Sequence, residues 1–135
     1  MFLNHFQIEC ADFGRSAAFY DAVLATLGAS RQEDFSPEAI GYGTDMGPEF
    51  WIGGNFPGAK SGRPCHLAFN APNCEQVEAF VAAARDLGYE VLHEPREWPE
   101  YMDSYYAGFV RDPDGNNVEA VHLDWTKLPK ASETS

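Results

Sequence analysis

Positive charge is scarce in this chain of 135 residues. Nine lysines and arginines stand against 21 aspartates and glutamates, which gives a formal net charge of −12. A nucleic-acid surface needs a basic patch, and attraction to an anionic membrane needs clustered lysine and arginine. The composition therefore argues against both kinds of partner. A negative surface favours solubility and also attracts cations, so charge alone identifies no site.

Cysteine and long apolar runs are scarce as well. The chain has only Cys10, Cys65 and Cys74, without a CxxC spacing, so it predicts neither a disulfide framework nor a zinc ribbon and favours a reducing compartment. There is no apolar run of about 18 residues, as a membrane-spanning helix would need. The opening MFLNHFQIEC lacks the basic and apolar regions of a signal peptide. We therefore expect a cytoplasmic protein.

What is present is enough for one folded domain. Hydrophobic residues make up 44% of the chain and aromatics 14%, and this length can bury a core of its own. We expect a single domain over residues 1–128, with a first half at about 1–55, a second at about 63–125, and a flexible tail at 129–135. Alternation and helical spacing predict strands at 2–10, 40–44, 49–53, 65–70, 90–93, 105–111 and 117–123, and helices at 13–27 and 74–87.

The two halves resemble each other. An offset of 61 residues places His5 on His66 and Phe19 on Phe80. An offset one residue shorter places Gly28 on Gly88. Each half is expected to run as strand, helix and three strands. Asp12 and Asn73 are expected to cap the two helices, because short polar side chains at that position accept hydrogen bonds from free backbone N–H groups.

Strand parity separates a polar face from an apolar one. Successive strand residues point to opposite sides of a sheet. The polar sides carry His5 and Gln7 in the first strand, His66 and Asn70 in the strand that opens the second half, and Glu119 in the last. The apolar sides should lie under the helices. The polar sides are then free to line a cleft.

Two imidazoles and one carboxylate from distant strands are typical ligands of a divalent metal that keeps open coordination positions. A strand histidine is also often a residue that bonds only to its neighbours, and Glu119 could be an ordinary strand glutamate. The equivalent places of the two histidines in the repeat favour the metal hypothesis.

These residues sit in stretches that resemble one family, the vicinal oxygen chelate superfamily of glyoxalases, bleomycin-resistance proteins and extradiol dioxygenases. The resemblance covers about residues 2–123. It rests on RSAAFY at 15–20, CHLAF at 65–69 and, most specifically, YYAGFVRDPDGNNVE at 105–119. It implies an α+β fold in which two βαβββ modules form a cup-shaped mixed sheet with both helices outside, and a homodimer.

The resemblance also implies a divalent metal, Fe, Mn, Ni or Zn, held by His5, His66 and Glu119. A fourth ligand would come from the middle of the chain, where either Glu49 or Trp51 can be aligned with Glu119. We favour three protein ligands, with Glu49 as a catalytic residue that moves a proton. Substrate-binding residues would then be Gln7, Trp51, Asn70 and Tyr101.

The expected function is that of a metal-dependent lyase, isomerase or dioxygenase acting on a small substrate that chelates the metal through two oxygens. The alternative is a metal-free protein that sequesters a flat small molecule, as bleomycin-resistance proteins do. The sequence fixes neither the substrate nor the metal.

Overall fold

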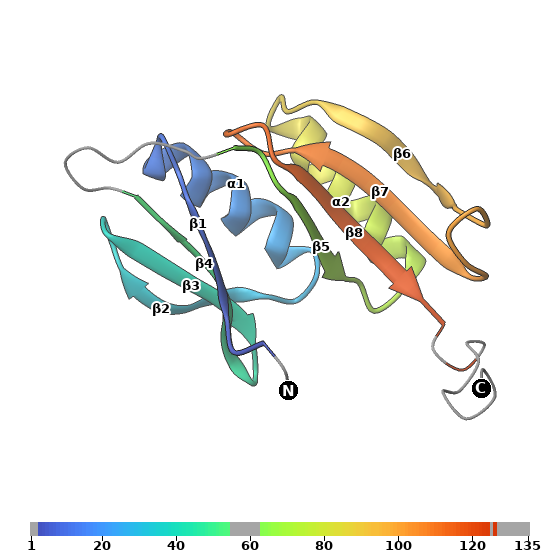
Figure 1. The fold of residues 1–135 in the computed structure, drawn as a ribbon, viewed down its shortest axis with the longest axis horizontal. Helices are drawn as coiled ribbons and strands as arrows, with labels where there is room; N and C mark the ends of the chain where they lie inside the picture. The colour runs from blue at the N-terminus through green and yellow to red at the C-terminus, as the bar shows by residue number, and fades with distance from the viewer. Residues whose placement is uncertain (1–2, 55–62, 125, 127–135) are drawn as a thin grey trace.

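The strand–helix–three-strand unit occurs twice in the computed structural model, which describes residues 3–54, 63–124 and 126 (Figure 1). Module 1 consists of β1 (Phe6–Glu9), α1 (Phe13–Ala25), β2 (Ser30–Phe35), β3 (Ala39–Thr44) and β4 (Gly47–Gly53). Module 2 consists of β5 (His66–Asn70), α2 (Cys74–Asp86), β6 (Val91–Glu97), β7 (Tyr105–Arg111) and β8 (Asn117–Leu123). The expected tail at 129–135 lies outside the described residues, as does most of the connector between the modules.

Each module builds one four-stranded mixed sheet with the same topology. The strand orders are β1-β4-β3-β2 and β5-β8-β7-β6. The first strand of each module pairs in parallel with the last, and the other pairs are antiparallel. The predicted α+β class and the duplication are confirmed. The two sheets stay separate within one chain, with no strand pairing between them among the described residues.

The helices begin and end where the sequence predicts. A side-chain oxygen of Asp12 accepts from the Arg15 backbone N–H at 3.1 Å, and that of Asn73 accepts from Gln76 at 2.9 Å, so both are N-caps. Gly28 follows the first helix with a φ of 83°, and Gly88 follows the second with a φ of 89°. Glycine adopts this left-handed conformation without a steric penalty, which ends each helix. No helix in the described part is long and apolar enough to cross a membrane.

The core lies on the helix side of both sheets. Helix α1 packs on β2 and β4 and also against α2, while α2 packs on β6, β7 and β8. In Figure 1, α1 lies between the two sheets. Phe50 of module 1 meets Phe69 of module 2 edge to face, with ring centroids 5.1 Å apart. The modules therefore share one core, and their polar sheet faces point away from it. Phe6, expected under a helix, is instead 41% exposed.

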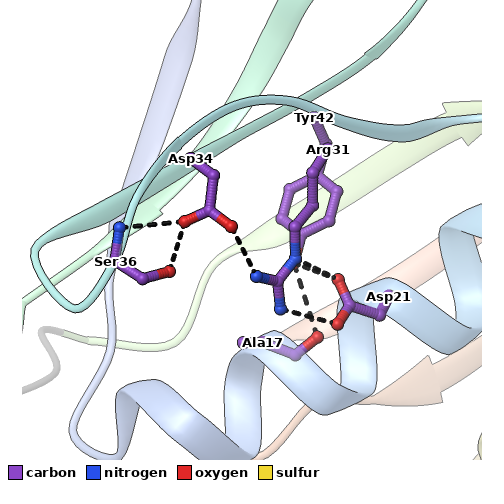
Figure 2. Close-up of polar contacts among 6 residues, drawn as sticks. All are labelled: Ala17, Asp21, Arg31, Asp34, Ser36 and Tyr42. Carbon is purple, nitrogen blue, oxygen red and sulfur yellow. Dashed lines mark hydrogen bonds and ion pairs between the residues drawn. The ribbon is translucent and has the colours of Figure 1, made fainter.

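The edge strand β2 was expected from the repeat but could not be located in the sequence, because all six of its residues are exposed and mostly polar. Polar contacts hold it to α1 (Figure 2). The Arg31 guanidinium donates to both carboxylate oxygens of Asp21, at 2.9 and 2.7 Å, and to Asp34 at 2.8 Å. The hydrogen bonds that Ser36 donates, together with that of Arg31, lower the pKa of Asp34 to about 2. The strand is thus held by its antiparallel pairing with β3 and by these polar contacts with α1, and not by a buried apolar face.

The turn at 112–116 joins the modules. The Asp112 carboxylate is 3% exposed and accepts from the Tyr20 hydroxyl of α1 at 2.6 Å and from the Asn116 side-chain amide at 2.8 Å. It also accepts from two backbone N–H groups of its own turn. Asp114 accepts from the Ala11 backbone N–H at 3.0 Å. The most characteristic motif of the sequence is therefore a structural joint between the halves.

Loss of this joint should destabilise the protein strongly. Asp112→Ala leaves a buried tyrosine hydroxyl and several N–H donors without a partner, so we expect the free energy of unfolding to fall by about 3 kcal/mol. Asp45→Ala, at an exposed position, is the matched control and should change it by less than about 0.5 kcal/mol. Urea denaturation of both variants measures the difference. Equal stabilities would show that the turn does not hold the modules together.

Candidate functional site

His66 and Glu119 meet on the polar face of module 2. Strands β5 and β8 run in parallel with His66 opposite Asn117 and Ala68 opposite Glu119, so the two side chains lie diagonally on one face. His66 Nε2 and Glu119 Oε1 are 2.7 Å apart. Two of the three predicted ligands, His66 and Glu119, therefore lie together.

Glu119 is buried, with 1% of its surface exposed, whereas His66 is exposed. The second carboxylate oxygen of Glu119, Oε2, accepts a hydrogen bond from the hydroxyl of Tyr105, at the start of β7. Partial burial and then this contact raise the pKa of Tyr105 above its usual value. The tyrosine therefore keeps its proton at neutral pH and acts as the donor. The buried carboxylate is held at both oxygens, and the imidazole lies at the surface above it.

Aromatic side chains surround this pair. Phe109 lies opposite Glu119 in the β7–β8 register, with its ring centroid 6.0 Å from that of His66. Trp98 packs edge to face on Phe109 at 5.2 Å, and Tyr101 stacks on Trp98 at 5.4 Å with an angle of 6° between the rings. Tyr101 is 55% exposed and contacts Tyr105 edge to face at 5.3 Å. The predicted substrate residue Tyr101 therefore stands at the rim of the His66–Glu119 site.

The polar face of module 1 carries a second aromatic surface. Trp51 stacks on Phe35 with centroids 6.1 Å apart and rings 6° from parallel, and Phe35 is 57% exposed. Gly41 makes this arrangement possible, since a Cβ at this position would lie 2.6 Å from the Trp51 ring. Gln7 pairs with Trp51 in register and bonds to Glu9 at 3.2 Å. Two of the predicted substrate residues, Gln7 and Trp51, thus lie side by side.

The strand register shows which residue of module 1 is equivalent in position to Glu119. Gln7 follows His5 by two residues, as Ala68 follows His66. Gln7 lies opposite Trp51, and Ala68 lies opposite Glu119. Trp51 therefore occupies in module 1 the place that Glu119 occupies in module 2. Tryptophan offers no metal-ligating atom, which favours a site with three protein ligands.

His5 does not join His66 and Glu119 within one chain. Its Nδ1 lies 2.6 Å from the Asn4 side-chain oxygen. Across residues 3–54, 63–124 and 126, no three His, Cys, Asp or Glu side chains are grouped so as to hold one metal ion. The cleft expected to gather all three ligands is thus not formed by a single chain. Its two halves lie on separate sheets.

Glu49 and Asn70 meet elsewhere, at a cleft of about 360 Å³ between the modules. Both residues are exposed. The walls come from the end of α1, strands β3 and β4, and the free edge of β5, and include Leu24, Leu27, Phe50 and Phe69. The predicted proton-moving residue therefore lies at the junction between the modules of one chain.

Comparison with known proteins agrees with this architecture. Residues 2–120 match the family model described as Glyoxalase/Bleomycin resistance protein/Dioxygenase superfamily. The chain belongs to the glyoxalase/bleomycin-resistance/dioxygenase superfamily. The family resemblance that the sequence motifs indicate is thus confirmed, along with the α+β fold of two βαβββ modules that it implies.

Several known proteins are similar to this chain over nearly their whole length. A glyoxalase/bleomycin resistance protein from Albidiferax ferrireducens T118 is 31% identical, with a TM-score of 0.77 over 90% of this chain and 99% of that one. The uncharacterized protein YqjT of Bacillus subtilis (strain 168) is 27% identical over 88% of this chain and 97% of its own. Lactoylglutathione lyase from Agrobacterium tumefaciens is 19% identical, with a TM-score of 0.64 over 92% and 96% of the two chains. This last likeness shows the fold alone.

Sequence reasoning missed three residues around the pair. Tyr105 and Phe109 share a face with Glu119, and continuing the register through the turn at 112–116 would have placed Phe109 opposite it. His93 also lies near the site, with its ring 5.1 Å from that of Trp98 and 5.6 Å from that of Phe109. The bulges in the β6–β7 pairing hide its position from simple alternation.

Proposed function

We propose that this protein is a divalent-metal-dependent enzyme whose ion is held by His5, His66 and Glu119. The observation that carries the proposal is the His66–Glu119 pair, an imidazole nitrogen 2.7 Å from a buried carboxylate oxygen. Two neighbouring ligands at about 2.1 Å from one ion, at right angles, stand about 3 Å apart. The distance between His66 Nε2 and Glu119 Oε1 therefore suits two adjacent ligands of one ion. The ion would replace the proton that the two atoms share.

Three protein ligands leave coordination positions for a substrate that binds through two oxygens. When bound, the metal would act as a Lewis acid that polarises those oxygens, or would activate oxygen if it is iron, consistent with lyase, isomerase or dioxygenase chemistry. Glu49 is the residue proposed to move a proton. Trp51, Gln7, Asn70 and Tyr101 are proposed to hold the substrate.

A homodimer would complete the site. Helices α1 and α2 pack on each other inside one chain, so the polar faces that carry His5 and His66 belong to different sheets that turn away from the shared core. A second copy related by two-fold symmetry can bring module 1 of one chain onto module 2 of the other, twice. The exposed Phe35–Trp51 stack supports this arrangement, because such a pair gains from being covered. In this proposal, His5 comes from the partner.

Metal analysis of the purified protein tests the proposal. We expect about one divalent ion for each chain, removable by a chelator and restored by Mn²⁺, Co²⁺, Ni²⁺ or Zn²⁺. Sedimentation should give a dimer and not a 15.0 kDa species. Failure of all four ions to bind at micromolar protein would overturn the metal site.

One observation favours the second candidate function, a metal-free protein that sequesters a flat ligand. His66, Glu119 and Tyr105 satisfy one another by hydrogen bonds, and stacked aromatics lie on both polar faces. Tight binding of an aromatic compound with no bound metal would support it. In either case we propose a cytoplasmic protein with small-molecule partners and without nucleic-acid or membrane partners.

A further inference from the structure

Each of the two carboxylate oxygens of Glu119 has a different partner. Oε1 faces His66 Nε2, at 2.7 Å, and Oε2 accepts from the Tyr105 hydroxyl. The side chain is 2% exposed, so water has almost no access to either oxygen. His66 and Tyr105 come from β5 and β7, which flank β8 on either side. The Glu119 carboxylate is therefore held by one side chain from each of the two strands that neighbour β8.

We propose that Tyr105 is a positioning residue that makes Glu119 a ligand through one oxygen only. The Tyr105 hydroxyl donates a hydrogen bond to Oε2, which leaves Oε1 facing His66, where the ion would lie. The inference rests on the metal site proposed above. A carboxylate with a free second oxygen can bind an ion through both, and this takes up a coordination position that a substrate would use. Tyr105 thus keeps that position open.

The surroundings of Tyr105 support a fixed orientation. Its ring lies edge to face against Tyr101, at 5.3 Å, and Tyr101 is itself stacked on the buried Trp98. The Trp98 indole N–H donates to the Ala107 carbonyl at 2.9 Å. A hydroxyl held by such packing loses little conformational freedom when it bonds to Glu119. Partners of this kind, one step removed from the ion, commonly change metal affinity by about 10- to 100-fold.

The neighbouring residue Tyr106 provides a matched control. It points to the opposite face of β7, where its hydroxyl donates to Glu78 of α2 at 2.8 Å. Tyr106→Phe removes the same atom from the same strand and also breaks a hydrogen bond to a glutamate. The difference between the two variants therefore isolates the contact with Glu119.

The experiment measures Co²⁺ binding to the full-length protein. We expect Tyr105→Phe to change Co²⁺ affinity by about 10- to 100-fold, because the carboxylate loses its fixed orientation and can bind through both oxygens. We also expect weaker visible absorption from the bound cobalt, because a second Glu119 oxygen raises the coordination number. Tyr106→Phe should match the wild type in both. Unchanged affinity and spectrum in Tyr105→Phe would overturn the inference, while the wild type would still bind metal.

A measurement on the wild type decides the matter even if Tyr105→Phe does not fold. The infrared difference between the Zn²⁺-bound and the metal-free wild type, compared with the same difference for Glu119→Gln, identifies the bands of the Glu119 carboxylate. The two carboxylate stretching bands lie further apart when one oxygen binds than when both do. A wide separation supports the role of Tyr105, and a narrow one contradicts it. Absence of Co²⁺ binding to the wild type would instead remove the metal proposal, and with it this inference.

Discussion

His66→Ala and Glu119→Gln should each abolish metal binding, with an affinity loss of roughly 100-fold or more, because each leaves two protein ligands where three are proposed. Glutamine preserves the size of the buried side chain, removes its charge and replaces one acceptor oxygen by an amide donor, which His66 Nε2 can accept from. The loss should therefore appear without unfolding. Titration with Co²⁺, read by calorimetry and by absorption, measures it.

Glu49→Gln is the control for this pair of variants. Its place is equivalent to Asn117 and not to Glu119, since Trp51 holds the ligand-equivalent position. We expect wild-type metal content and a slower reaction once a substrate is known. Equal, severe loss in Glu49→Gln and Glu119→Gln would demonstrate a four-ligand site and contradict the three-ligand assignment. Full retention in Glu119→Gln would favour the metal-free binding protein.

Mixing two inactive variants should restore metal sites. If His5 of one chain completes the site with His66 and Glu119 of its partner, His5→Ala and His66→Ala homodimers each have none. A heterodimer of the two has one site with both changes and one with neither. After unfolding and refolding an equal mixture, half of the dimers are heterodimers, so about one quarter of all sites should bind Co²⁺.

The control for this experiment is a mixture in which both changes fall in module 2. His66→Ala with Glu119→Gln should restore nothing, because the two ligands come from the same chain and each heterodimer site lacks one of them. Restoration in this control, or none in the His5→Ala and His66→Ala mixture, would contradict a site shared between chains. The second result would place all three ligands within one chain or exclude His5.

Much of this architecture is predictable because the decisive patterns are local. Each helix has a capping residue before it and a glycine after it, and Asp12 and Gly28 suffice to place α1. Strand parity likewise assigns His66 and Glu119 to one face, since β5 and β8 are regular over the stretch where they pair. The family motifs at 105–119 add the topology, which local patterns do not determine.

The remainder depends on contacts between distant residues. Strand β2 has no buried residue, and its position follows from backbone pairing with β3 and from the bonds of Arg31 to Asp21 on α1. The alternation of side chains along a strand also does not determine whether the two sheets face each other within one chain. That depends on how α1 packs against α2, so His5 could be assigned to a face but not to a partner.

The register that sets Trp51 opposite Gln7 and Glu119 opposite Ala68 has a consequence for how such a protein can change over evolution. Duplication produces the same strand position twice. In module 2 it holds the buried acid Glu119, and in module 1 it holds the aromatic residue Trp51. In the proposed site, exchange at Trp51 would reshape ligand preference while the acid stays intact, because the two positions lie on separate sheets. Exchange at Glu119 disturbs two hydrogen bonds at once. New specificities should therefore arise far more readily through module 1 than through module 2.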